Sequence, residues 1–346
     1  MSVRVCRLHG QHDLRLEVVP EIQPGEGEVS VRIGAAGICG SDLHYFQDGG
    51  FGPIRVREPI ILGHEAAGTV ERLGQGVTGL AVGDRVAVNP SRPCGRCRYC
   101  LEGLFQHCLA MRFSGSALRF PHEQGLFRDR VVVQATQCVV VSGGRSIAET
   151  ACSEPLAVCL HAANRAGELM GARVLVTGAG PIGALCVAVA SHRGAAEIVV
   201  TDLHDQPLAV ARRMGATKTI NIAADPRALE VYETDKGHFD MAFECSAAAA
   251  AIDAAIRCVR PLGRIVQVGV AGALPVAISA LVGKEIAFLG THRFHAEFTE
   301  AARLIDSGVI DVKTIITHSF APEDLAEAFR VAGDRAQSVK TQLAFS

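Results

Sequence analysis

The sequence lacks the features that mark nucleic-acid-binding, membrane and secreted proteins. It contains no tryptophan, and its 34 lysine and arginine residues are balanced by 36 aspartate and glutamate residues. The net charge of −2 leaves no basic excess of the kind that nucleic-acid binding requires. The apolar run at residues 184–190 is far shorter than the ~20 residues of a membrane-spanning helix. Because Arg4 and Arg7 interrupt the first residues, no secretory signal is visible, and we expect a cytoplasmic protein without membrane or nucleic-acid partners.

What the chain does contain is typical of a globular protein. At about 100–200 residues per domain, its 346 residues suggest two domains. Hydrophobic residues make up 49% and charged residues 20%, which argues against long disordered segments. Of twelve cysteines, four lie between Cys94 and Cys108. In a reducing compartment such a cluster binds metal or does chemistry more often than it forms disulfides.

The first half of the chain has the pattern of short β-strands. Alternating segments such as residues 29–33 and 85–88 are separated by glycine, proline and aspartate. Short strands separated by such residues continue to about residue 150. They predict a small barrel or sandwich.

From about residue 170 the pattern changes to strands alternating with helices. We expect six strands, at residues 173–177, 197–201, 218–222, 239–244, 264–268 and 286–289. Helices are expected at residues 181–193, 206–214 and 248–259, and two more, at 297–307 and 322–332, precede a short final strand. Alternation of this kind builds βαβ units, so the sequence predicts an α/β protein with a doubly wound, six-stranded parallel sheet.

A glycine-rich segment follows the first of these strands. Gly178, Gly180 and Gly183 have the G-x-G-x-x-G spacing, and Pro181 and Ile182 open the helix that follows. Such glycines allow a tight turn and the close approach of a pyrophosphate, which the free N–H groups at the helix N-terminus bind. The segment therefore predicts a dinucleotide site rather than a strand-to-helix turn without a ligand.

Asp202 lies 24 residues after Gly178, at the end of the next predicted strand. A carboxylate at this place binds the adenosine ribose hydroxyls and repels a 2′-phosphate. The residues that follow are Leu203, His204 and Asp205, so no arginine is at hand to bind such a phosphate. We therefore expect NAD as the cofactor, with NADP as the alternative.

The clustered cysteines have the spacing of a metal site. Cys94, Cys97, Cys100 and Cys108 form a C-x2-C-x2-C-x7-C pattern. Zinc takes four thiolates in a closed tetrahedron, which leaves no open position and gives a structural rather than a catalytic site. An iron–sulfur cluster uses the same ligands, and an empty cluster is the other alternative.

A second set of metal-binding residue types is scattered along the chain. Cys39, His64, Glu65 and Glu154 are all types that ligate zinc, but each also has an ordinary structural interpretation. Their spacing alone does not join them into one site.

The segments around these residues resemble the zinc-containing medium-chain alcohol and polyol dehydrogenases. The similar segments are residues 37–44, 63–70 and 83–86, followed in the family's order by the four cysteines and the glycine loop. A glutamate at position 154 is typical of the sorbitol dehydrogenase branch. Within it, several segments are similar to the L-idonate 5-dehydrogenases, and residues 113–122 are the most discriminating; the segments are residues 39–45, 89–94, 111–113, 115–117, 120–122 and 154–158. The resemblance covers essentially the whole chain and implies NAD, two Zn2+ ions per chain and a homotetramer.

The resemblance also implies a division of the chain into domains. It implies a GroES-like catalytic domain at residues 1–153, with a structural zinc lobe at about residues 90–110. A Rossmann domain would follow at residues 154–292, and residues 293–346 would return to the catalytic domain.

Carried over by position, the resemblance implies catalytic roles. Cys39 and His64 are implied as ligands of the catalytic zinc. Glu65 occupies the position of a carboxylate that is a ligand in the sorbitol dehydrogenase branch, and Glu154 is implied either to bind the metal or to hold its water. Ser41 is implied to receive the alcohol proton, which then passes toward His44.

A sugar acid carries a carboxylate, so its site needs a cation, preferably an arginine. The candidates for substrate contact are Tyr45, Arg112, Arg119, His122 and Arg293. The implied reaction is zinc-dependent hydride transfer from a secondary hydroxyl of a sugar acid to NAD. The alternatives are a general polyol dehydrogenase and an NAD-binding zinc module without turnover, which would need neither an incomplete coordination sphere nor a proton relay.

Overall fold

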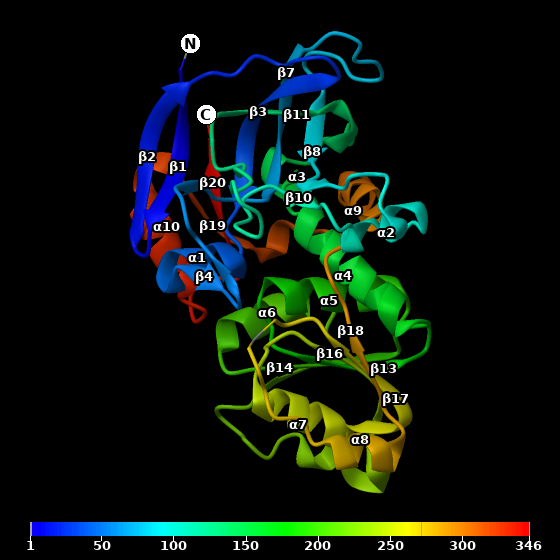
Figure 1. Ribbon diagram of the computed structural model, residues 1–346. Coiled ribbons are helices and arrows are strands. Elements are labelled where there is room, and N and C mark those ends of the chain that lie inside the picture. The colour runs from blue at the N-terminus through cyan, green and yellow to red at the C-terminus, as the bar shows by residue number, and fades with distance from the viewer. Residues whose placement is uncertain (1, 271, 346) are drawn as a thin grey trace.

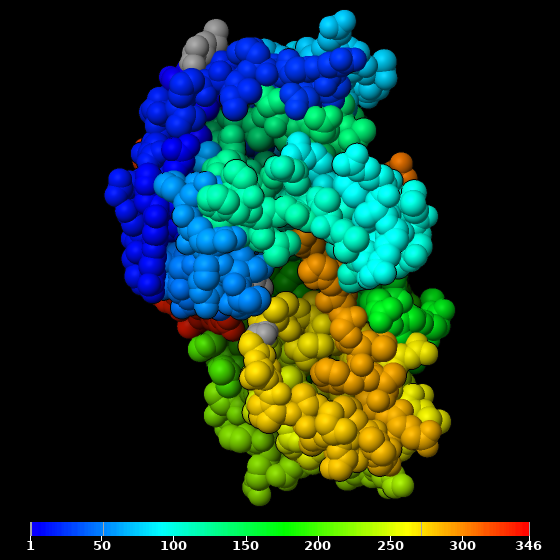
Figure 2. Space-filling model, viewed as in Figure 1, coloured from blue at the N-terminus to red at the C-terminus, as the bar shows by residue number. Residues whose placement is uncertain are grey.

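The computed structural model describes residues 2–270 and 272–345. In Figure 1 strands from both ends of the chain form the upper half, and the middle of the chain forms a separate sheet below. Helix α4 (Ser153–Ala166) runs between the two halves and packs against α9 (Glu297–Asp306). Figure 2 shows a hollow between the halves, where residues near 50 and 120 face residues near 270 and 290.

The lower sheet confirms the predicted doubly wound fold. Its six strands are all parallel and lie in the order β15-β14-β13-β16-β17-β18. The strands are β13 (Arg173–Thr177), β14 (Glu197–Asp202), β15 (Lys218–Asn221), β16 (Phe239–Glu244), β17 (Val259–Gln267) and β18 (Ala287–Gly290). The order reverses between β13 and β16, and ligands of such sheets bind at that crevice, outside the carboxyl ends of the strands.

Apolar residues on both faces of β13 explain why this sheet is covered on both sides. Val174 and Val176 pack into one core with α4 and α5, whereas Leu175 packs into another with α7. Parallel sheets are buried in this way because their crossover helices cover both faces. The covering helices are α5 (Pro181–His192), α6 (Asp205–Arg213), α7 (Ala249–Cys258) and α8 (Ile278–Lys284).

The upper half is β-rich, as predicted. Its main sheet has the order β12-β8-β7-β3-β20-β19, with β11 also pairing with β3. These strands are β3 (Glu28–Gly37), β7 (Glu65–Leu73), β8 (Arg85–Val88), β11 (Arg130–Gln134), β12 (Cys138–Val140), β19 (Ile316–Phe320) and β20 (Lys340–Ala344). A smaller sheet joins β1 (Ser2–Gly10), β2 (Asp13–Pro20) and β6 (Ile60–Ile61).

The two ends of the chain meet in the main upper sheet. Strand β20 pairs antiparallel with β3, and Gln342 lies opposite Gly37. The C-terminal residues therefore reach the segment that carries Cys39. The domain boundaries at residues 153 and 292 remain predictions.

Short elements complete the upper half. The helices are α1 (Gly40–Asp48), α2 (Arg98–Leu101), α3 (Ile147–Thr150) and α10 (Leu325–Gly333). The short strands are β4 (Gly50–Phe51), β5 (Ile54–Arg55), β9 (Ser91–Arg92) and β10 (Arg112–Phe113). Within the described part of the chain, every helix is too short or too polar to cross a membrane.

Candidate metal centres and dinucleotide site

The pairing of β3 with β7 brings three candidate metal ligands together. Gly37 at the end of β3 lies opposite Glu65 at the start of β7, so Cys39, two residues further on, meets His64. The ligand atoms of Cys39, His64 and Glu65 all lie within 4.8 Å of one another. Sulfur, imidazole and carboxylate ligands at this spacing fit a zinc ion, which binds each of them at about 2.0–2.3 Å.

Glu154 contributes a second carboxylate to the same region. It lies in the first turn of α4 and is buried, but it is not part of the group of three. Burial raises the pKa of Glu154 to about 7, and His64 is the strongest opposing charge. No hydrogen bond to its carboxylate is found among residues 2–270 and 272–345. A buried carboxylate without a hydrogen-bond partner fits a position that a bound cation would complete.

A buried carboxylate, that of Asp42, lies next to the histidine of this group. This carboxylate lies 3.8 Å from Nδ1 of His64 and accepts hydrogen bonds from the N–H groups of Cys39 (3.0 Å) and Gly63 (3.1 Å). Although burial alone would lower it, Asp42 and Cys39 raise the pKa of His64 well above its ordinary value. The surrounding negative charge thus favours a cation here, and a carboxylate behind a ligating histidine is the usual arrangement in zinc sites.

Glu65 is already paired with a lysine from the far end of the chain. Nζ of Lys340 lies 2.7 Å and 2.9 Å from its two carboxylate oxygens and also donates to the carbonyl of Ile38 (3.2 Å). Both side chains are 2% exposed. The ion pair anchors the backbone next to Cys39, and it leaves Glu65 less free than Glu154 to bind a metal.

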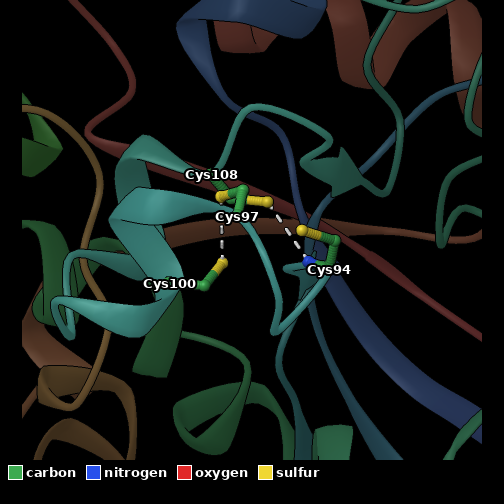
Figure 3. Close-up of side chains that lie close together, drawn as sticks. All are labelled: Cys94, Cys97, Cys100 and Cys108. Atoms are coloured by element: carbon green, nitrogen blue, oxygen red, sulfur yellow. Dashed lines mark hydrogen bonds between the residues drawn. The ribbon is translucent and has the colours of Figure 1, made fainter.

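The four cysteines converge as their spacing predicts. Their sulfur atoms lie within 4.8 Å of one another, with Cys97 and Cys100 3.5 Å apart (Figure 3). Four thiolates at about 2.3 Å from one zinc ion would lie about 3.8 Å apart, so the group fits a closed tetrahedral site. The N–H groups of Cys100 and Leu109 lower the pKa of Cys97 to about 6, which favours the thiolate that metal binding needs.

The glycine loop has the geometry of a dinucleotide site. Gly178 has a φ of 86°, and a Cβ at Gly183 would lie 1.8 Å from the carbonyl oxygen of Gly178. A Cβ at Gly180 would meet no atom within 4 Å, so that side of the loop is open. Pro181 begins α5, in the first turn where its missing N–H costs no hydrogen bond, and Ile182 follows it. The loop therefore fits a pyrophosphate at the helix N-terminus.

Asp202 faces this loop from the end of β14. Its carboxylate accepts hydrogen bonds from the N–H groups of Ala179 (2.7 Å), Leu203 (2.7 Å) and His204 (3.0 Å). These contacts fix the carboxylate next to the glycine loop, at the place where a ribose-binding group is required.

The candidate relay and wall residues lie on α1, directly after Cys39. Ser41 is in its first turn, and His44 is exposed, with Nδ1 2.8 Å from Asp48. Tyr45 is buried, and its hydroxyl oxygen accepts a hydrogen bond from the N–H of Ala117 (3.2 Å). Tyr45 acts only as an acceptor in this hydrogen bond, so the bond does not use its hydroxyl proton.

Two of the candidate cations, Arg112 and Arg119, are already bound to other groups of the protein. The guanidinium of Arg112 is exposed and pairs with Glu123 at 2.6 Å, while Arg119 donates to the carbonyls of Met111 (2.8 Å) and Leu109. Neither contact places the charge beside Glu154.

The ring of His122 is held by backbone groups, and its contact with the substrate stays a prediction. His122 is buried, and its Nε2 accepts a hydrogen bond from the N–H of Arg57 (2.8 Å). Its Nδ1 donates to the carbonyl of Arg119 (2.6 Å). Both ring nitrogens are therefore used by backbone groups, one from the same loop and one from Arg57.

Arg293 differs from the other candidates. Its guanidinium lies over the ring of Phe113, 4.0 Å from the centroid, and the same ring lies 5.6 Å from that of His64. The charges of Glu154 and Tyr45 act on it most strongly, and burial lowers its pKa. Within the described residues no ion pair or hydrogen bond of this guanidinium is found, so it is a partly buried cation available to a ligand.

Sequence reasoning did not find Asp42 or Lys340. Asp42 has a local signal, because it lies three residues after Cys39 at the start of a helix, the spacing of a capping box. Lys340 has none, since it lies 275 residues from its partner Glu65.

Comparison with known proteins gives the same assignment for both halves. Residues 25–143 match the alcohol dehydrogenase GroES-like domain, and residues 181–307 match the zinc-binding dehydrogenase family. The chain is 41% identical over 316 residues to L-idonate 5-dehydrogenase (NAD(P)(+)) of Escherichia coli K12, covering 91% of each chain. It is 34% identical over 336 residues to sorbitol dehydrogenase of Bacillus subtilis, covering 96% of this chain and 94% of that one.

A solved structure shows the same fold. The crystal structure of L-idonate 5-dehydrogenase from Escherichia coli K-12 matches 100% of this chain and 99% of its own, with a TM-score of 0.94 and 38% identity. The predicted fold class, a GroES-like domain with a Rossmann domain, is confirmed. The chain therefore belongs to the zinc-binding medium-chain alcohol and polyol dehydrogenase family, among its L-idonate and sorbitol dehydrogenase relatives.

Proposed function

We propose that the protein oxidises a secondary hydroxyl of a sugar acid by hydride transfer to NAD, converting L-idonate to 5-keto-D-gluconate. The observation that carries the substrate class is Arg293, a partly buried guanidinium that lies over Phe113 and has no hydrogen-bond or ion-pair partner among the described residues. A planar guanidinium matches a carboxylate with two parallel hydrogen bonds. The similarity to L-idonate 5-dehydrogenase of Escherichia coli supports the same substrate.

The catalytic metal is zinc, held by Cys39 and His64 with a carboxylate as the third ligand. We assign that third position to Glu154, because both oxygens of Glu65 are bound to Lys340. Glu65 then does not bind the metal, and its ion pair with Lys340 anchors the backbone at Ile38, next to Cys39. When bound, zinc lowers the pKa of the substrate hydroxyl and stabilises the charge that develops on its oxygen. A second zinc occupies the four-cysteine group and has a structural role.

The glycine loop and Asp202 hold the cofactor, which accepts the hydride when bound. We assign NAD rather than NADP because the Asp202 carboxylate, fixed by three N–H groups, would repel a 2′-phosphate. Oxidation releases one proton along with the hydride. Ser41 receives this proton, and the exposed imidazole of His44 delivers it to water.

The test is a substrate panel on the purified protein with NAD. L-idonate, sorbitol, xylitol and threonine are compared by kcat/KM, and we expect L-idonate to be preferred. Arg293→Ala is expected to reduce kcat/KM for L-idonate more than for sorbitol, because only the acid loses a charge partner. Arg112→Ala, which removes an arginine already paired with Glu123, is the matched control and is expected to change neither value. A preference for an uncharged polyol, or equal losses on both substrates in Arg293→Ala, would remove the sugar-acid assignment.

A general polyol dehydrogenase is the second candidate. The 34% identity to sorbitol dehydrogenase over almost the whole chain favours it, and the same panel separates the two. An NAD-binding module without turnover is disfavoured, because it would need neither the partnerless Glu154 nor the exposed His44 on α1.

We further propose a cytoplasmic homotetramer. None of the twelve cysteines, all of which lie in the described part of the chain, forms a disulfide, which fits a reducing compartment, and light scattering of the purified protein measures the assembly.

A further inference from the structure

The loop that holds the four cysteines also touches the segment that carries Arg293. We call residues 94–108 the four-cysteine lobe and residues 292–295 the arginine segment. The ring of Phe105 stacks on that of His295, with centroids 3.9 Å apart and planes at 25°. The ring of His107 stacks on that of His292 at 5.8 Å and 22°. Two aromatic contacts from the lobe thus lie on either side of Arg293 in the sequence.

The base of the lobe contacts Arg293 directly. Strands β9 and β10 pair on the two sides of the lobe, with Phe113 opposite Ser91. The guanidinium of Arg293 lies over the ring of Phe113, and the ring of His64 lies 5.6 Å from that same ring. The lobe therefore contacts the side chains of His292 and His295, and its base contacts the side chain of Arg293 itself.

The arginine segment requires such support. Arg293 has a φ of 53°, in the left-handed region that residues with a side chain rarely occupy. Only its surroundings hold a non-glycine residue in that conformation. The segment is fixed from one side by the buried ring of Phe294, which stacks on Phe298 (5.6 Å), and by the hydrogen bond from the His295 N–H to Glu297 (2.9 Å). From the other side, the two ring stacks of the lobe contact it.

We propose that the four-cysteine lobe is a positioning device for substrate recognition, in which Phe105 and His107 hold Arg293 in its binding position. The proposal rests on the proposed function in one respect, namely that Arg293 contacts the substrate. It gives the lobe a role beyond stability: the four cysteines fix its shape, and that shape reaches the substrate through two ring stacks and Phe113. Phe105 and His107 are positioning residues, since they act through Arg293.

The first test compares three lobe variants of the full chain. Phe105→Ala removes the stack on His295, and Phe105→Tyr keeps it. Leu101→Ala is the control, because it removes another apolar side chain of the lobe; Leu101 is 76% exposed. We expect Phe105→Ala to raise KM for L-idonate about tenfold while kcat changes less than about twofold, since a misplaced arginine weakens binding first. Phe105→Tyr and Leu101→Ala are expected to match the wild type. The zinc content and the dissociation constant for NADH, read from NADH fluorescence, are expected to stay unchanged in all three.

The second test removes the stack from the opposite side. His295→Ala leaves the lobe sequence intact and keeps the backbone N–H that bonds to Glu297, so it separates lobe folding from arginine positioning. It is expected to reproduce the KM increase of Phe105→Ala. Because both variants act through Arg293, Phe105→Ala combined with Arg293→Ala is expected to lose no more than Arg293→Ala alone.

The outcomes separate the two proposals. Unchanged KM values for the preferred substrate in Phe105→Ala and His295→Ala, or additive losses in the double variant, would overturn the positioning role. A wild-type preference for sorbitol in the substrate panel would overturn the sugar-acid assignment, and the positioning role is then judged by the same ratios measured with sorbitol. Loss of zinc from Phe105→Ala together with a wild-type KM in His295→Ala would show that the lobe serves stability alone.

Discussion

Lys340 and Glu65 form a buried ion pair across 275 residues, with Nζ 2.7 Å from the nearer carboxylate oxygen. Although burial opposes it, Glu65 raises the pKa of Lys340 above its ordinary value. The pair joins the last strand of the chain to the strand that begins next to His64. The pair therefore links residue 340 to the two segments that carry Cys39 and His64.

Breaking this pair is expected to destabilise the protein strongly. Lys340→Met leaves the buried carboxylate of Glu65 without a partner, so we expect the free energy of unfolding to fall by about 3–5 kcal/mol. Urea unfolding measures the loss. Adding Glu65→Gln to Lys340→Met is expected to restore part of it, because the unpaired charge is gone. A loss below about 0.5 kcal/mol in the single variant would mean that the pair contributes nothing.

Two glycines of the nucleotide loop are expected to respond differently to alanine. A Cβ at Gly183 would lie 1.8 Å from the Gly178 oxygen, so Gly183→Ala is expected to lower both the thermal midpoint and NADH affinity. A Cβ at Gly180 meets nothing within 4 Å in the protein but would face the pyrophosphate. Gly180→Ala is therefore expected to keep the wild-type midpoint while NADH affinity falls about tenfold, or about 1.4 kcal/mol. Equal thermal midpoints for the two variants would contradict this account of the loop.

Cofactor choice is expected to depend on the charge of Asp202. Asp202→Asn keeps one acceptor oxygen, which suffices for the N–H groups of Leu203 and His204 but not for that of Ala179, and it removes the charge that repels a 2′-phosphate. We expect the ratio of kcat/KM for NADP to that for NAD to rise about tenfold, equivalent to about 1.4 kcal/mol. Steady-state kinetics with both cofactors measure the ratio. An unchanged ratio would show that another group sets the preference.

Glu297 is expected to make stability depend on pH. Burial opposes its ionisation, but hydrogen bonds from His161, the His295 N–H and Asn164 lower the pKa of Glu297 from about 4.5 to about 2. Its stabilisation is therefore present above pH 4.5 and lost as the pH falls toward 2.

The comparison of wild type with Glu297→Gln isolates this contribution. In urea unfolding at pH 6 we expect the wild type to be more stable by about 1–3 kcal/mol, and we expect the difference to shrink by pH 3. A difference that stays constant over this range would exclude an ionised Glu297 as its source.

Much of the lower half could be predicted because its signals are local. Apolar runs such as Val174–Val176 with a glycine loop behind them specify a buried strand and the helix after it. Strand β17 begins at Val259, five residues before its predicted start at 264, because Pro261 and Gly263 interrupt the strand pattern. In the upper half, β6 and β9 have two residues each, and only their distant partners make them strands.

In the candidate site, too, contacts between residues close in the sequence could be predicted, and contacts between distant residues could not. The four cysteines lie within fifteen residues, so spacing alone predicted their convergence. The approach of Cys39 to His64 depends on the register of β3 against β7, which the sequence does not state. No sequence pattern shows that backbone groups of Arg57 and Arg119 use both ring nitrogens of His122.

The account depends most on a zinc ion at Cys39, and zinc content measured beside turnover tests it directly. We expect two zinc ions per wild-type chain and one in Cys39→Ser, which is expected to bind NADH normally but to lose L-idonate oxidation by at least about a thousandfold. Wild-type protein with zinc only at the four cysteines, or a Cys39→Ser variant that keeps both zinc ions and its turnover, would contradict the account.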